Sequence, residues 1–249
     1  MIIKKLNKNN INIKNKETCI LILAAGKGSR MKSSKPKILS IVKNISLLDH
    51  AVNKFKKLKF RKIYVLISEK LKNITKRNDC IYVYQKKPLG TGHAIKVFLK
   101  KINNKFKKVI VMYADTPFIH KKDIKKLLIK VKKNDLTLIG FKKKNNESFG
   151  IIKLINKKVS SIVEFKNASK NERKINLCNS GSMGFKKIIF REFFQIKKNK
   201  KMKEFLATDI VKILYKKKYK IGLIKSSYPL LCEGINSQSE LREYRKIIV

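Results

Sequence analysis

Acidic residues are scarce in this sequence, and its cysteines are few and unpaired. The 249 residues include 16 Asp and Glu against 63 Lys and Arg, which gives a formal net charge of +47. No C-x-x-C pair marks a zinc site or a redox motif. We therefore expect reduced, mostly buried thiols at the four isolated cysteines, which are Cys19, Cys80, Cys178 and Cys232.

Long apolar runs are missing as well. The longest, Cys19 to Ala25, is far shorter than the roughly 20 residues that a membrane helix needs. The first 16 residues are rich in Lys and Asn and have no continuous apolar stretch, so they do not indicate a secretory signal. We expect a cytoplasmic protein with no membrane partner and with a basic N-terminal extension over residues 1–16.

The excess positive charge is spread through almost every segment of the chain. It is accompanied by many Asn and Ile residues, and all three residue types have A/T-rich codons, so a base-composition bias explains it best. The alternative is an electrostatic role, for which a triphosphate substrate is the simplest beneficiary. We expect no nucleic-acid partner, because the aromatic residues lie mainly in apolar runs without a recognition motif.

Short apolar runs alternate with stretches of helical periodicity, which predicts an α/β fold with a mostly parallel central sheet flanked by helices. The second half suggests a mixed or antiparallel portion. Strands are predicted at 18–23, 62–67, 80–84, 109–113, 136–141, 150–155, 159–164, 182–185 and 221–225. Helices are predicted at 46–58, 92–101 and 121–133, with a last helix at 208–218.

The first predicted strand runs into a loop of small residues, Leu23-Ala24-Ala25-Gly26-Lys27-Gly28-Ser29-Arg30-Met31. Small side chains let backbone N–H groups approach a phosphate, and the guanidinium of Arg30 can grip phosphate oxygens in a bidentate manner. The loop lacks the third glycine of a dinucleotide site and does not fit a Walker motif. By itself it predicts a generic phosphate site.

With Pro36-Lys37, this loop resembles the L-A-A-G-x-G-T/S-R-M and P-K signature of the sugar-nucleotide pyrophosphorylases. Later motifs resemble, within that family, the uridylyltransferase half of the bacterial bifunctional enzymes that make UDP-N-acetylglucosamine. The resemblance implies a Rossmann-like nucleotidyltransferase domain over residues 17–249. It assigns catalysis to Arg30 and Lys37 and nucleotide binding to Leu23, Ala24, Ala25, Gly26, Gly28 and Lys37.

Two further motifs resemble the base and metal sites of that family. Gln85 and the following Leu89-Gly90-Thr91-Gly92-His93-Ala94 imply recognition of uracil by Gln85, Gly90 and Thr91. Asp115, at the end of an apolar strand, and Asn236, in Glu233-Gly234-Ile235-Asn236, imply a Mg²⁺ site. The histidines His50, His93 and His120 are expected to have structural roles.

A third group of motifs resembles the sugar site of the family, and it implies contacts from Tyr113, Gly150, Glu164, Asn179 and Thr208. An isolated Thr208 would be interpreted as a helix N-cap. The sequence departs from the family at Ile151, where Arg is usual, and at Asn167, where Asp is usual. These departures leave the sugar open.

The resemblance thus predicts a Mg²⁺-dependent enzyme that transfers UMP from UTP to N-acetylglucosamine 1-phosphate. Alternatives are a related transferase for another sugar phosphate or for CTP or GTP, and less favoured are a basic nucleic-acid-binding protein or an inactive homologue. The bifunctional members continue into a β-helix that transfers acetyl groups. Because this chain ends at Val249, we expect no acetyltransferase activity and no trimer.

Overall fold

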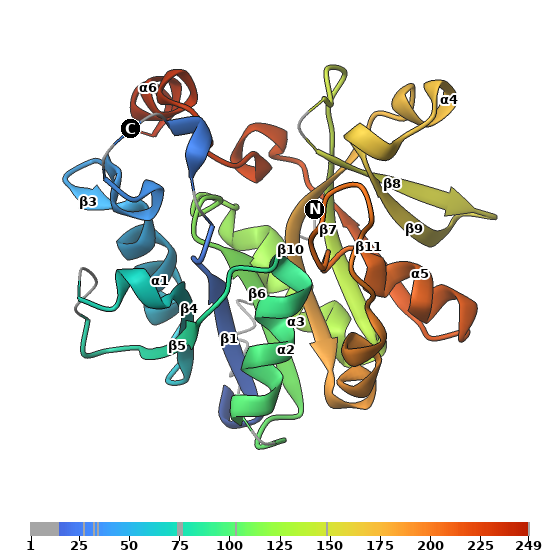
Figure 1. The fold of residues 1–249 in the computed structure, drawn as a ribbon. Coiled ribbons are helices and arrows are strands. Elements are labelled where there is room, and N and C mark those ends of the chain that lie inside the picture. Colours follow the sequence, from blue (N-terminus) through green and yellow to red (C-terminus); the bar gives the residue numbers. More distant parts are fainter. Residues whose placement is uncertain are drawn as a thin grey trace, which may run out of the picture.

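A computed structural model describes residues 15–248, apart from positions 27, 32, 34, 74–76, 103 and 148. Most of the predicted N-terminal extension and Lys27 of the phosphate loop therefore lie outside the described residues. In the described part, helices cover a twisted sheet, and two strands project from one side of it (Figure 1). None of the helices described here is long and apolar enough to cross a membrane.

The main sheet has the strand order β11-β7-β10-β6-β1-β4-β5, and β8 and β9 form an antiparallel pair that joins it through β10. Of the strands in the main order, β10 alone runs against its neighbours. The predicted fold class, a mostly parallel sheet with an antiparallel portion, is therefore confirmed. The strands are β1 (Thr18–Leu23), β4 (Ile63–Ser68), β5 (Ile81–Gln85), β6 (Lys108–Tyr113), β7 (Leu136–Lys142), β8 (Gly150–Ile155), β9 (Lys158–Glu164), β10 (Leu177–Lys186) and β11 (Ile221–Lys225).

The longer helices follow the amphipathic stretches of the sequence, and the short strands β2 (Ile41–Val42) and β3 (Ile45–Ser46) pair in a separate hairpin. The helices are α1 (Leu47–Lys57), α2 (Thr91–Ile102), α3 (Lys121–Lys133), α4 (Lys170–Arg173), α5 (Asp209–Lys216) and α6 (Gln238–Ile247). The prediction of a last helix at 208–218 is wrong in one respect, because α6 follows it. The sequence of α6 is dominated by charged residues and has few apolar positions, of which Leu241 and Tyr244 are buried, so its helical pattern is weak.

Strand β10 is also longer than the predicted 182–185. Its first half contains the polar run Asn179-Ser180-Gly181-Ser182, which does not have the apolar pattern of a buried strand. The Ser180 hydroxyl donates to the carbonyl of Ile139 at 2.8 Å, and the pairing with β7 shifts register between Asn179 and Met183. A bulge and a side-chain hydrogen bond thus accommodate polar residues in the middle of the sheet.

Alternate residues of the central strands pack against different helix layers. In β1, Cys19, Leu21 and Leu23 face the side covered by α2 and α5, whereas Ile20 and Ile22 face the side covered by α1 and α3. Figure 1 shows α2 crossing in front of the sheet. Both faces of the central parallel strands β1, β4 and β6 are buried, which is why those strands are continuous apolar runs in the sequence.

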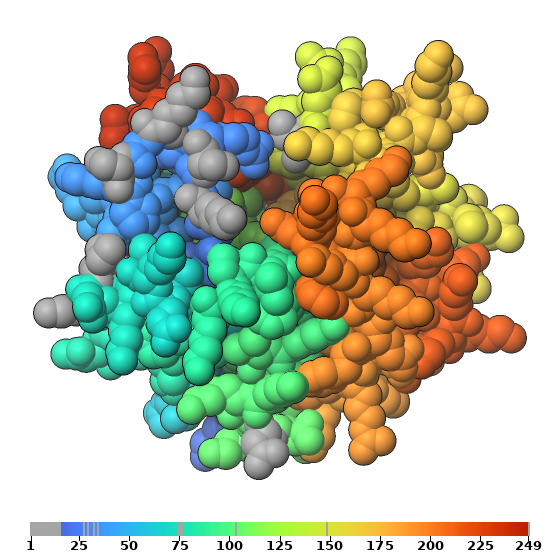
Figure 2. Space-filling model, in the orientation of Figure 1, coloured from blue at the N-terminus to red at the C-terminus, as the bar shows by residue number. Residues whose placement is uncertain are grey.

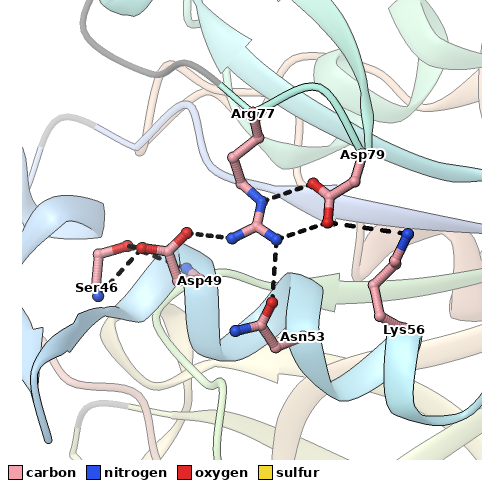
Figure 3. A network of polar contacts seen from close by, with 6 residues as sticks. All are labelled: Ser46, Asp49, Asn53, Lys56, Arg77 and Asp79. Carbon is pink, nitrogen blue, oxygen red and sulfur yellow. Dashed lines mark hydrogen bonds and ion pairs between the residues drawn. The ribbon is translucent and has the colours of Figure 1, made fainter.

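A polar network fastens the loop before β5 to α1 (Figure 3). The guanidinium of Arg77 donates twice to Asp79, at 2.9 and 2.8 Å, and also to Asp49 and to Asn53. Asp49 in turn forms a capping box with Ser46 at the start of α1. One side chain therefore holds the chain that leads into β5 against the helix beneath it.

The prediction that the cysteines are mostly buried thiols is confirmed. All four are free thiols, and Cys19, Cys178 and Cys232 are buried, while Cys80 is half-buried. Burial raises the pKa of Cys178 and of Cys232 to about 11. These thiols are therefore protonated at neutral pH and unsuited to nucleophilic chemistry.

Candidate active site

Two adjoining cavities of about 360 and 240 Å³ open at the carboxyl ends of the parallel strands. Ligands of open α/β sheets bind at this edge. The larger cavity is lined by every residue assigned to the nucleotide, and the smaller by every residue assigned to the sugar. The cavities share one set of lining residues: Arg30, Thr91, Tyr113, Asp115, Glu204 and Asn236.

The phosphate loop leaves β1 at Leu23 and returns toward Lys37. Gly28 has a φ of +63°, and a Cβ there would lie 2.8 Å from the Cβ of Lys37, so only glycine allows this close approach. The backbone N–H of Met31 then donates to the Gly28 carbonyl at 2.9 Å, which closes the turn that carries Arg30. The described part of the loop brings backbone and guanidinium to the same cavity wall.

The ammonium of Lys37 lies between the two predicted metal ligands. It donates to Asp115 Oδ2 and, at 3.0 Å, to Asn236 Oδ1, so both oxygens converge on one cation. The backbone N–H of Ile235 donates to the Asp115 carbonyl at 2.8 Å, and Asn236 Nδ2 donates to the Gly234 carbonyl at 3.0 Å. The two ligands are therefore held in place before any ion binds.

This pair of oxygens fits Mg²⁺. The ion binds proteins through one or two oxygen ligands and completes its shell with water and substrate phosphates. A carboxylate and an amide oxygen already share one positive charge here, and the phosphate loop lies in the same cavity. Within the part of the chain that the structure describes, no cluster of three or more His, Cys, Asp or Glu could form a protein-only metal site.

The end of the larger cavity that is predicted to hold the base is built from the end of β5 and the turn before α2. Gln85 is 2% exposed, and its Nε2 lies 2.7 Å from Nδ1 of His93. Gly90 has a φ of +104°, and a Cβ there would lie 2.6 Å from the carbonyl oxygen of Phe205. The Thr91 hydroxyl accepts from the backbone N–H of Ala207 at 3.0 Å. The turn is thus fitted tightly against the chain before α5.

The smaller cavity holds polar groups that are only partly satisfied within the protein. Thr208 does not cap α5 with its side chain, since its hydroxyl donates to Glu164 Oε1 at 2.9 Å. Burial raises the pKa of the Glu164 carboxyl. Asn179 Oδ1 is buried and has no hydrogen-bond partner among the described residues. Asn179 and Glu164 both line this cavity, and their side chains are of the kind that bind hydroxyl or amide groups of a ligand.

Tyr113 and Gly150 complete the wall between these groups. Tyr113 lines both cavities, and removal of its hydroxyl from solvent raises its pKa. A Cβ at Gly150 would lie 2.8 Å from Cγ2 of Ile162 and 3.6 Å from the carboxylate oxygens of Glu164, so close packing of β8 on β9 requires a glycine beside this acid. The structure therefore brings the five predicted sugar residues together in one cavity.

The two departures from the family lie outside that cavity wall. Ile151 is fully buried in β8, opposite Val163 of β9 and Cys178 of β10, where an apolar side chain packs. Asn167 is half-buried in the turn after β9. Neither residue lines either of the two cavities.

No sequence motif indicated the segment 197–205, which lies along one side of the site. Its ends pair through Lys198 and Phe205, and the N–H of Phe205 donates to the Leu89 carbonyl at 2.9 Å. Figure 2 shows this orange segment beside the green residues at the start of α2, next to a hollow in the surface. Its residues Met202 and Glu204 line the site, but their motif is lysine-rich and indicates only a loop.

The glycine loop, the oxygens of Asp115 and Asn236, and the second polar cavity beside them are arranged as the sequence predicts for a nucleotidyltransferase. The chain belongs to the family described as the MobA-like NTP transferase domain, which matches residues 20–181. This places the phosphate loop, Gln85, Asp115 and Asn179 inside the matched region, while Asn236 lies beyond it.

Similar proteins agree with this family. The chain is 34% identical over 236 residues to the bifunctional protein GlmU of Buchnera aphidicola subsp. Baizongia pistaciae, covering 92% of this chain and 52% of that protein. Identity to GlmU of Acetivibrio thermocellus is 31% over 234 residues, covering 92% and 51%. The chain thus spans about half the length of the curated relatives it matches.

A solved structure shares the fold. It comes from Bacillus anthracis, is provisionally assigned as a glucose-1-phosphate thymidylyltransferase, and was determined in complex with a sucrose. The TM-score is 0.69 at 18% identity, with 92% of this chain and 94% of that chain covered. At this identity the likeness establishes the nucleotidyltransferase fold alone.

Proposed function

We propose that this chain transfers UMP from UTP to N-acetylglucosamine 1-phosphate. The products are pyrophosphate and UDP-N-acetylglucosamine, which is a precursor for cell-envelope polymers. The observation that carries the proposal is the junction of the two cavities at Arg30, Asp115 and Asn236. A triphosphate in the larger cavity and a sugar phosphate in the smaller one would meet there. The motifs that resemble the uridylyltransferase half of the bacterial UDP-N-acetylglucosamine enzymes support UTP and this sugar as the substrate pair.

The reaction needs no enzyme nucleophile. A phosphate oxygen of the sugar phosphate attacks the α-phosphorus of UTP in line, the new P–O bond forms, and the bond to the β-phosphate breaks as pyrophosphate leaves. Arg30 and Lys37 donate to phosphate oxygens and offset the charge that develops on them. The buried thiols and the three histidines have no covalent part in this scheme.

Asp115 and Asn236 are the residues that would hold Mg²⁺. When bound, the ion neutralises phosphate charge and acts as a Lewis acid. Lys37 must then leave its present position between the two oxygens, and the triphosphate offers it new acceptors. The ammonium thus has one partner set in the free protein and another in the substrate complex.

The polar groups of the smaller cavity suit an N-acetylated sugar. Asn179 lines this cavity with an amide that can both donate and accept, and Glu164, with Thr208 beside it, can accept from sugar hydroxyls. The phenol ring of Tyr113 lies between the two cavities and separates base and sugar ends. Together they provide both a polar cradle and an apolar wall.

The proposal is tested by pyrophosphate release with Mg²⁺, UTP and a panel of sugar 1-phosphates. We expect release with N-acetylglucosamine 1-phosphate and much less with glucose 1-phosphate or glucosamine 1-phosphate. The Asn179→Ala variant should raise KM for the sugar phosphate more than KM for UTP. Release that is equal for all three sugars would contradict the sugar assignment while leaving nucleotidyl transfer in place.

A further inference from the structure

The amide of Gln85 lies at the proposed base end of the larger cavity. The nitrogen Nε2 and the oxygen Oε1 of this amide have different surroundings. Its Nε2 donates to Nδ1 of His93 at 2.7 Å, because an amide nitrogen can only donate. No described residue donates to its Oε1. Gln85 is almost wholly buried and lines the cavity, so the carbonyl and the second N–H remain for a ligand.

The position of His93 allows its Nδ1 to accept this bond. It lies in the first turn of α2, half-buried, with its ring centroid 6.1 Å from that of Phe205. Burial and the nearby charges of Lys96 and Lys100 lower the pKa of His93, which favours the neutral ring. A neutral imidazole that accepts at Nδ1 carries its proton on Nε2.

The orientation of an amide decides which pyrimidine it can read. Uracil has a donor at N3 and an acceptor at O4, whereas cytosine has an acceptor at N3 and a donor at N4. An amide that presents its carbonyl to position 3 and its N–H to position 4 therefore pairs with uracil. The flipped amide, at the same base position, pairs with cytosine. Without a neighbour that fixes it, an amide can adopt either orientation.

We propose that His93 is a positioning residue that fixes the orientation of the Gln85 amide and so makes the site select one pyrimidine over the other. The inference rests on the proposed function, in which the selected base is uracil. His93 acts through Gln85 and does not touch the base. In the tautomer with its proton on Nε2, His93 makes the flipped amide unfavourable, because two acceptors, Oε1 and Nδ1, would then face each other.

The variant His93→Phe tests the proposal, since it keeps an aromatic ring beside Phe205 and removes the acceptor. The readout is the ratio of the Kd for CTP to the Kd for UTP, measured by calorimetry with Mg²⁺. A correctly placed bidentate pair of hydrogen bonds discriminates between two bases by about tenfold to a hundredfold. The ratio of the Kd for CTP to the Kd for UTP should therefore fall by that factor. Most of the change should come from tighter CTP binding, because the freed amide can flip.

Lys96→Met is the matched control. Lys96 is also on α2, and its Nζ lies 4.4 Å from the centre of the Phe205 ring and 2.7 Å from the Ile196 carbonyl. The variant disturbs the same packing without touching the Gln85 amide. Because Lys96 also lowers the pKa of His93, binding is measured at about pH 8, where the ring is neutral with or without this charge, so the Kd ratio should remain that of the unmodified protein. An unchanged ratio in His93→Phe, or an equal fall in Lys96→Met, would overturn the proposal.

A second measurement on the unmodified protein does not depend on which base binds. Long-range ¹H–¹⁵N spectra of the histidine rings report which nitrogen carries the proton. We expect His93 with Nε2 protonated and Nδ1 free to accept, and a ring protonated at Nδ1 would refute the proposal. If the protein prefers a triphosphate other than UTP, the proposed function fails, but this spectrum still decides whether His93 orients Gln85.

Discussion

Replacing Lys37 by Met should make the protein bind a divalent ion more tightly when no nucleotide is present. In the free protein the ammonium of Lys37 bonds to the oxygens of Asp115 and Asn236 that would hold the ion. Its side chain is 9% exposed, so water competes little for this bond. An incoming ion must therefore displace a buried cation, and the Met side chain removes that requirement.

The size of the effect follows from the bond to the carboxylate. Hydrogen bonds to charged groups contribute about 1.5 to 3 kcal/mol each. At about 1.4 kcal/mol per factor of ten, the Lys37→Met variant should bind Mn²⁺ about 10- to 150-fold more tightly than the unmodified protein. Free Mn²⁺ can be followed directly by electron paramagnetic resonance. The same variant should bind UTP more weakly, because one phosphate donor is lost.

Lys54→Met is the matched control for charge. Lys54 is also partly buried, and its Nζ donates to the Ile119 carbonyl, away from the two ligand oxygens. Both variants lose one positive charge, so a general field effect would raise Mn²⁺ affinity in both. Equal Mn²⁺ affinities in the two variants, or a lower Mn²⁺ affinity in Lys37→Met, would refute the view that Lys37 competes with the ion for Asp115 and Asn236.

Three further predictions concern glycine geometry, pH and the loop network. Gly90→Ala should cost about 1–3 kcal/mol of unfolding free energy in urea, because its φ is +104° and its Cβ would meet backbone at 2.6 Å. Gly26→Ala, which meets nothing within 4 Å, should change stability by less than about 0.5 kcal/mol and yet weaken UTP binding in calorimetry. Equal destabilisation by both would count against this geometry. Since burial raises the pKa of Glu164, the folded state holds more protons than the unfolded state above the ordinary carboxyl pKa, and stability falls as pH rises through that window. Glu164→Gln should therefore be more stable than the parent at pH 7 in urea titrations, with the gain lost below about pH 4, and a gain of the same size at both pH values would contradict this. Arg77→Lys should lower the thermal midpoint, measured by calorimetry, by about 2–4 °C for each kcal/mol of unfolding free energy that is lost. Lys56→Gln, at an exposed residue of the same network, should leave that midpoint unchanged.

Much of the fold could be predicted from the sequence because both faces of the central parallel strands β1, β4 and β6 are buried. Strand β1 and helix α3 lie where the apolar pattern predicts them, at Thr18–Leu23 and Lys121–Lys133. The pattern failed at β10, where a hydrogen bond from Ser180 replaces apolar packing. It also failed at α6, where two buried side chains on a charged helix are too weak a signal.

The composition of the two cavities was predictable to a similar degree, since short motifs at strand ends carry most of the lining residues. Spatial relations between distant motifs were not. The bond from Lys37 to Asn236 joins residues 199 positions apart, and no local pattern encodes it. Glu204 was missed for the same reason: its segment is positioned by backbone bonds from Phe205 to the turn before α2. The functional roles of all these residues remain predictions.

The most direct test of the proposed reaction is a competition among all four ribonucleoside triphosphates. The protein is incubated with equal amounts of ATP, CTP, GTP and UTP, Mg²⁺ and N-acetylglucosamine 1-phosphate, and the products are identified by mass. We predict that UDP-N-acetylglucosamine is the nucleotide sugar formed and that it appears in equal amount with pyrophosphate. A product that carries another nucleotide, or no nucleotide sugar at all, would contradict the proposed function.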